Sequence, residues 1–114
     1  MTSVVMTKNG ETIKEFYLSG HAGFGRKGKD IVCAAVSALS INAVNSLELL
    51  CDEKPEVLTN EKDGFLRCIR KAPYSKEGDL IMKSLELGLK GIASEYGNRY
   101  LDVKIQEVET NVKA

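Results

Sequence analysis

The chain has 114 residues, of which 43% are hydrophobic and 28% are charged. This composition is typical of a globular protein, and the length predicts a single domain, residues 1–114, that can bury a core without disulfides. Sixteen basic and sixteen acidic side chains cancel, so no net charge attracts nucleic acid, and direct nucleic-acid binding is not expected.

The three cysteines, at positions 33, 51 and 68, form neither a C-x-x-C pair nor an even disulfide framework, which indicates a reducing, cytoplasmic compartment. The N-terminus lacks the charged segment and apolar core of a signal peptide. Residues 31–47 carry no charge, but serines and asparagines interrupt this run, which is shorter than the ~20 apolar residues of a membrane span. We therefore expect a buried helix of a soluble protein and no membrane association.

Two runs rich in β-branched and aromatic residues open the chain, at residues 3–7 and 12–18. Asn9-Gly10 between them predicts a tight hairpin turn, because these residues readily adopt positive φ angles. The apolar residues of the second run do not alternate regularly. Either both faces of the hairpin are partly covered, or a bulge interrupts the pairing.

The glycine-rich segment 20–29 is expected to be a loop, and Asp30 is a good N-cap for the apolar run that follows it. Its carboxylate can accept hydrogen bonds from the free amides of the first helical turn. The predicted helix continues to about Cys51. It is apolar on most sides, which indicates a central position in the fold.

The second half of the chain repeats the pattern of a hairpin followed by a helix. Residues 57–60 and 65–70 flank a four-residue turn, Glu61 to Gly64. A second, amphipathic helix begins near Ser75 or Asp79 and ends at Gly97, since glycine adopts the left-handed C′ conformation at little cost. Its apolar residues recur at helical spacing: Ile81, Leu85, Leu89, Ile92 and Tyr96.

Residues 101–106 alternate between apolar and polar, which predicts a final strand with one wet face. The predicted order is β-β-α-β-β-α-β. Two hairpins and two helices indicate an α+β fold, a two-layer sandwich with a mostly antiparallel sheet covered by helices on one face or both.

The glycine-rich loop contains a literal G-x-G-x-x-G, from Gly23 to Gly28. A dinucleotide site requires a parallel βαβ unit with an acidic residue about twenty positions further on. Here the preceding strand belongs to a hairpin, and Glu48 still lies within the predicted helix. Asp30 follows Gly28-Lys29, which excludes a Walker loop. We therefore expect no nucleotide cofactor, and we expect no other cofactor and no metal either. Three basic residues of the loop are interpreted as part of a solvated surface: Arg26, Lys27 and Lys29.

The same loop also joins His21, the only histidine, to Cys33. Cys33 lies at about the third helical position, where free amides and the helix dipole favour a reactive thiolate. A histidine at the end of the preceding strand can take the thiol proton and later protonate a leaving amine. A surface imidazole and a buried structural thiol are the alternative. The position of His21 between Gly20 and Gly23 favours catalysis, whereas Cys51 and Cys68 lie in core-like runs and are interpreted as structural.

Gly20-His21, the loop, and the run from Asp30 to Ser37 closely resemble the ribosomal-processing cysteine proteases (Prp type) of Firmicutes and related bacteria. The resemblance covers nearly the full chain, and the combined motif G-H-x(8)-D-I-V-C-A-A-x-S shows no departure. It implies a cysteine endopeptidase that removes the short N-terminal extension of a large-subunit ribosomal protein, the twenty-seventh by number. It further implies that Cys33 is the nucleophile and His21 the base, that the enzyme is a homodimer, and that the loop moves to admit the substrate.

Two polar residues of the motif have two interpretations each. Asp30 either caps the helix, which its place before an apolar run favours, or orients His21 like the aspartate of a triad. Ser37 lies one turn after Cys33 on the same helix face. Its hydroxyl can bond to the surroundings of the cysteine or back to its own helix.

The loop glycines predict a segment that closes over a bound peptide, because glycine reaches unusual backbone angles easily: Gly20, Gly23, Gly25 and Gly28. Amides of this loop, with that of Cys33 itself, are candidate donors to the oxyanion. Phe24 either contacts the substrate or folds back onto the sheet. Two functions of other classes stay open: a non-enzymatic ribosome- or RNA-associated module that uses the basic loop, and, more weakly, a thiol redox sensor.

Overall fold

The computed structural model describes residues 1–26 and 30–108. The predicted β-β-α-β-β-α-β order is confirmed, and the ends of the elements differ from the expected ones by at most two residues. The elements are β1 (Thr2–Asn9), β2 (Thr12–Ser19), α1 (Ile31–Leu49), β3 (Glu56–Asn60), β4 (Phe65–Ile69), α2 (Lys76–Tyr96) and β5 (Leu101–Glu107).

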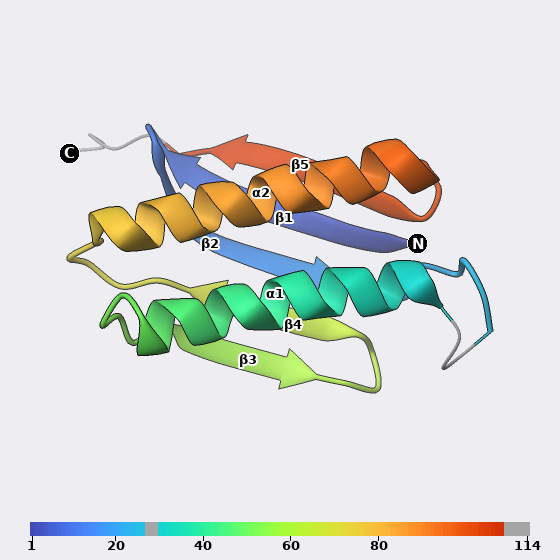
Figure 1. The fold of residues 1–114 in the computed structure, drawn as a ribbon, viewed down its shortest axis with the longest axis horizontal. Helices are drawn as coiled ribbons and strands as arrows, with labels where there is room; N and C mark the ends of the chain where they lie inside the picture. The colour runs from blue at the N-terminus through green and yellow to red at the C-terminus, as the bar shows by residue number, and fades with distance from the viewer. Residues whose placement is uncertain (27–29, 109–114) are drawn as a thin grey trace.

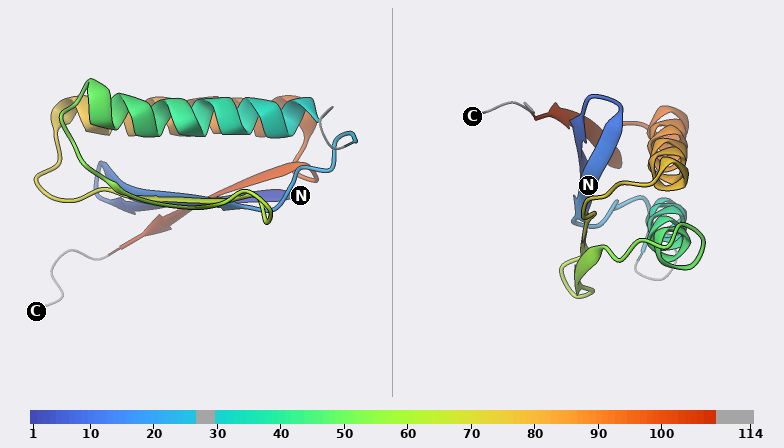
Figure 2. Two further views of the ribbon diagram at one scale, coloured as in Figure 1. Left: turned by 90° about the horizontal axis from the view of Figure 1, so that it is seen from below. Right: turned by 90° about the vertical axis from the view of Figure 1, so that its left-hand side faces the viewer.

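The five strands form one sheet in the order β3-β4-β2-β1-β5. All neighbours are antiparallel except β1 and β5, which run parallel, so the expectation of a mostly antiparallel sheet is confirmed. Both helices lie side by side on one face of this sheet, and its other face is open (Figures 1 and 2). The fold is therefore a two-layer α+β sandwich.

A β-bulge explains the irregular pattern of β2. The pairing of β1 with β2 shifts between Thr7, opposite Glu15, and Lys8, opposite Ile13, so Lys14 is the extra residue. The bulge lets Ile13 and Phe16 both point into the core although they are three residues apart. At the turn itself only Gly10 has a positive φ, 64°.

Helix α1 is not central, in contrast to the expectation from its composition. Its inner face is buried through Val32, Val36 and Leu47, whereas Ile41 is 53% exposed and Leu49 is 80% exposed. A two-layer fold has no third layer to cover the outer face of the helix (Figure 2). By length and composition α1 is also apolar enough to cross a membrane. The buried helix of a globular fold passes the same test, so this property of α1 is weak evidence for a membrane span.

A buried ion cluster closes the end of the sandwich where β4 leaves the sheet. The Arg70 side chain, fully buried, donates to both Glu53 carboxylate oxygens at 2.8 and 2.6 Å and to Asp79 Oδ1 at 2.9 Å. Ser75 is the N-cap of α2 and also donates to Glu53. Burial by itself raises the pKa of the Glu53 carboxyl, but the hydrogen bonds from Arg70 and Ser75 outweigh it and hold this pKa below its usual value.

Candidate active site

The start of α1 is held by Asp30, as predicted. Asp30 has extended backbone angles, and its Oδ1 accepts a hydrogen bond of 3.0 Å from the amide of Cys33, the third residue of the helix. Its Oδ2 accepts another, also 3.0 Å, from the amide of Phe24 in the loop. Partial burial raises the pKa of the Asp30 carboxyl, but these amide bonds outweigh it, so the pKa lies below its usual value.

Within the described residues, Asp30 makes no hydrogen bond to His21. Both of its oxygens serve backbone amides instead. The geometry therefore supports the capping role over the orienting one.

The sulfur of Cys33 has a backbone donor of its own. The amide of Ala22, a buried residue, donates to Cys33 Sγ over 3.2 Å. The amide of Cys33, a candidate donor to the oxyanion, is bonded to Asp30 in this conformation. The N–H group directed at the Cys33 sulfur belongs to Ala22.

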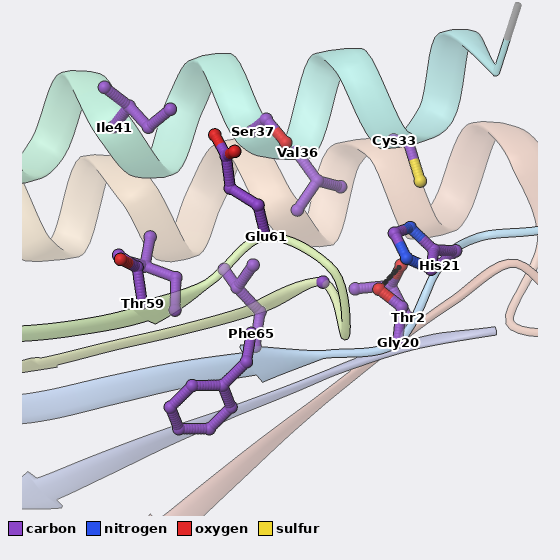
Figure 3. Close-up of a pocket in the computed structure, with 13 residues that line it drawn as sticks. Thr2, Gly20, His21, Cys33, Val36, Ser37, Ile41, Thr59, Glu61 and Phe65 are labelled. Carbon is purple, nitrogen blue, oxygen red and sulfur yellow. Dashed lines mark hydrogen bonds between the residues drawn. The ribbon is translucent and has the colours of Figure 1, made fainter. Parts of the chain in front are cut away.

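His21 is the second residue after β2. Its ring lies beside the Cys33 sulfur, which points toward it (Figure 3). The preceding residue, Gly20, has a φ of 88°, and a Cβ there would lie 2.5 Å from the carbonyl oxygen of Met1. The Gly20 amide donates to the carbonyl of Asp63 over 3.3 Å. The chain that carries His21 is thus held between the start of β1 and the β3–β4 turn.

Two adjoining cavities open at this place, with volumes of about 390 and 640 Å³, and His21, Cys33 and Ser37 line both. The first runs along α1 from Cys33 to Ile41. Its other apolar walls come from Leu18 and Leu66, and the polar residues Thr59 and Glu61 also line it. Phe65 lines the cavity too, but its ring points away from it (Figure 3), toward the ring of Tyr17. An apolar cleft with a thiol and an imidazole at one end suits an extended peptide.

The loop residues are divided between the cavity and the fold. Gly23 and Gly25 line the second cavity with Asp30. Phe24 lines neither cavity; its ring packs edge-on against Tyr96 at 5.3 Å and Tyr100 at 5.0 Å between ring centroids. Phe24 therefore folds back, against the end of α2 and the following connection. Three loop residues of the sequence predictions lie outside the described residues: Lys27, Gly28 and Lys29.

The other two cysteines lie away from these cavities. Cys68 is fully buried, and burial raises the pKa of its thiol to about 12. Burial also raises the pKa of the Cys51 thiol. In the described ranges, no group of three or more His, Cys, Asp or Glu side chains could hold a metal ion.

Sequence reasoning missed the contributions of the second hairpin and of the N-terminus. Thr2, Thr59 and Glu61 line the cavity, and Gly64 lies against Gly20 and the His21 ring. The glycine ending a four-residue turn was visible in the sequence. Its contact with a residue more than forty positions earlier was not, because β4 pairs with β2 across the sheet.

The profile of the cysteine protease Prp family matches residues 1–101. This chain belongs to that family. It is therefore a cysteine protease, and the non-enzymatic alternative is wrong. A relative from Staphylococcus aureus strain Mu50, called ribosomal processing cysteine protease Prp, is 31% identical over 97 residues, which cover 84% of this chain and 92% of the relative.

Two crystal structures of the essential ribosomal processing protease Prp from S. aureus have the same fold. The one with a covalently linked product peptide has a TM-score of 0.87 and 29% identity, and the match covers 93% of this chain and all of that one. The one with a substrate peptide has a TM-score of 0.82 and 28% identity over the same shares. The expected α+β architecture of the family is thus confirmed.

Proposed function

We propose that this Prp-family protease is a ribosomal-processing endopeptidase. Its substrate would be the short N-terminal extension of a large-subunit ribosomal protein, the twenty-seventh by number. The names of the S. aureus relatives, and the peptides bound in their structures, support this class of substrate. The observation that carries the proposal here is that Cys33 and His21 meet at one end of a cleft shaped for a peptide.

In the proposed mechanism, the His21 imidazole takes the proton from Cys33 Sγ, and the thiolate attacks the carbonyl carbon of the scissile peptide bond. The C–N bond then breaks, and the imidazolium gives its proton to the leaving amine. A thioester to the N-terminal fragment remains on Cys33. Water attacks this thioester while His21 takes its proton, which releases the fragment as a carboxylic acid and restores the thiol.

The Ala22 amide stabilises negative charge at the start of this sequence. It lies 3.2 Å from the sulfur, so it can donate to the thiolate before attack and to the nearby oxyanion after it. Asp30 contributes indirectly, because it accepts hydrogen bonds from one backbone amide in the loop and one in the helix, and these hold Cys33 and the loop in place. Gly20, Gly23, Gly25 and Ser37 line the cavities beside the pair and are proposed to contact or admit the substrate.

The cleft also indicates which side chains the substrate presents. Between Cys33 and Ile41 it is lined mainly by apolar groups, and two helical turns correspond to roughly 11 Å. That length holds about three extended residues. We propose that it takes apolar side chains on one side of the scissile bond.

The test is to incubate the protein with the ribosomal-protein precursor and to read the cleavage position by mass spectrometry. Wild type should yield one cut at the end of the extension. Cys33→Ser and His21→Ala should fold, with unchanged circular dichroism, but lose detectable cleavage, whereas Cys51→Ser should retain it. Cleavage by Cys33→Ser would overturn the assignment of the nucleophile, and cleavage by His21→Ala that of the base.

Three further features are proposed here: the homodimer implied by the resemblance, the cytoplasmic location predicted from the cysteines, and the lack of direct nucleic-acid binding predicted from the balanced charge. Sedimentation equilibrium of the full chain tests the first. Cell fractionation tests the second. The third is tested by titrating the protein with ribosomal RNA at physiological salt, where tight binding would contradict it.

A further inference from the structure

The β3–β4 turn, residues 61–64, lies directly against the chain that carries the proposed base. Gly64 has a φ of 63°, and a Cβ at this position would lie 2.5 Å from the carbonyl oxygen of Gly20 and 3.0 Å from Cε1 of His21. The adjacent Asp63 carbonyl accepts the Gly20 amide at 3.3 Å. The turn therefore contacts both the backbone before His21 and the ring itself.

His21 needs such a contact because little else holds its side chain. The residue is exposed, and among the hydrogen bonds of the described residues none involves its imidazole. An unrestrained ring on an exposed strand end samples several rotamers, and only some of them face Cys33. The bare backbone of Gly64 offers a flat surface on which the ring can lie.

We propose that Gly64 is a positioning residue for the catalytic histidine. The absence of a side chain at position 64 lets the β3–β4 turn approach within van der Waals contact of His21 and keep its ring directed at Cys33. This inference rests on the proposed role of His21 as the base. It adds a second hairpin, distant in sequence, to the machinery of proton transfer.

The chain contains a matched control for this proposal. Gly10, in the β1–β2 turn at the other end of the sheet (Figure 1), has a φ of 64°, and a Cβ there would have nothing within 4 Å. Gly10→Ala and Gly64→Ala thus impose the same backbone strain. Only Gly64→Ala places a methyl group against Gly20 and His21.

We expect Gly64→Ala to lower kcat for precursor cleavage by about 10- to 100-fold, because small displacements of a catalytic group have effects of that size. KM should change by less than about threefold, since the apolar walls of the cleft stay in place. Gly10→Ala should keep both parameters close to wild type and lose less thermal stability, because it adds backbone strain without a clash. Equal kcat values for the two variants would overturn the proposal.

The single histidine allows a direct readout that does not depend on activity. The ¹H–¹³C signal of His21 Cε1 is unique in this chain, and this is the His21 atom nearest to the Cβ position of Gly64. The signal should shift or broaden in Gly64→Ala and stay in place in Gly10→Ala. An unchanged signal in Gly64→Ala would contradict the contact.

A double-mutant cycle covers the case in which Gly64→Ala is poorly folded. Without the ring, one of the two clashes disappears, so the loss of Tm caused by Gly64→Ala should be smaller in the His21→Ala background. An equal loss in both backgrounds would show that the ring is not involved. If His21→Ala itself cleaves normally, the proposed function fails; if it is inactive while Gly64→Ala matches Gly10→Ala, only the present inference fails.

Discussion

Asp30 joins two segments through one carboxylate. One oxygen accepts the amide of Cys33 and the other accepts the amide of Phe24, and the Phe24 ring in turn packs on Tyr96 and Tyr100. The helix start, the loop and the end of α2 are thereby connected at the catalytic end. Because each carboxylate oxygen accepts a backbone amide, Asp30 places the cysteine at the helix start.

Removing this cap should reduce stability. We expect Asp30→Ala to lower the free energy of unfolding by about 1 kcal/mol, and Asp30→Asn to lower it by less, because asparagine is also a good N-cap. Urea denaturation followed by circular dichroism measures both. The pH profile of Cys33 alkylation should be nearly the same in Asp30→Asn and wild type; a large shift would show that Asp30 takes part in the ionisation of the Cys33–His21 pair.

The Ala22 amide can be tested by replacing Ala22 with its α-hydroxy analogue, which exchanges the amide for an ester and removes the N–H. We expect kcat for cleavage to fall by roughly 10- to 100-fold, somewhat less than for a full oxyanion donor. The same exchange at Lys54, an exposed residue that lines neither cavity, serves as the control and should have little effect. An unchanged kcat at position 22 would show that its 3.2 Å contact with Cys33 has no catalytic role.

At the scale of the elements, sequence reasoning succeeds where the determinants are local. Asp30 and Ser75 are N-caps and Gly97 ends α2, as their side chains or lack of one predict. The order of the strands was not predicted, because β1–β5 and β2–β4 pairing depends on contacts between residues far apart in sequence. The exposure of α1 was mispredicted for the same reason, since composition does not reveal how many layers cover a helix.

In the candidate site, too, the residues that lie close together in the sequence were predicted, and those from distant segments were not. His21, Cys33 and Asp30 belong to one continuous stretch, and the resemblance of that stretch to a protease motif implies the roles proposed for His21 and Cys33. Gly64 and the rim residue Glu61 come from the second hairpin. Their place in the site follows from the antiparallel pairing of β4 with β2, which no local pattern encodes.

Helix α2 contains two glycines that test its packing. Gly91 is exposed, and a Cβ there would have nothing within 4 Å, whereas at Gly88 it would lie 2.8 Å from Cδ1 of Leu39 on α1. Gly91→Ala should raise the free energy of unfolding by about 0.5–1 kcal/mol, because alanine favours a helix interior. Gly88→Ala should gain less, since Leu39 must move; urea denaturation compares the two, and an equal gain would contradict the close helix–helix contact.

At the scale of the whole molecule, the buried cluster around Arg70 makes the stability of the fold depend on pH. The pKa of the Glu53 carboxyl is 4.5 in the unfolded chain and lower in the folded protein. Its contribution to the free energy of unfolding is therefore fully present above pH 4.5 and is lost as the pH falls through the folded-state pKa. Asp30 adds an effect of the same sign. The free energy of unfolding should therefore decline steeply below about pH 4.5.

Glu53→Gln tests this assignment. We expect it to cost about 3 kcal/mol at pH 7, because it breaks the buried bidentate ion pair of Arg70 and leaves the partly exposed Asp79 as the remaining charged partner. It should also flatten the acid limb of the stability curve. Glu56→Gln, at an exposed position on β3, is the control and should leave the curve unchanged. Urea titrations at pH 3 to 7 measure the effect. An acid limb as steep in Glu53→Gln as in wild type would place the sensitive group elsewhere.

The ion cluster lies where α1 ends and α2 begins, and the cleft runs along the first half of α1. The start of α1 lies at the other end of the helix layer from the start of α2 (Figure 1). Evolution or engineering can consequently adjust thermal tolerance at the arginine end without disturbing proton transfer at the sulfur end. A library randomised at Glu53, Ser75 and Asp79, which surround Arg70, would yield variants that differ in half-life on heating while sharing one turnover number.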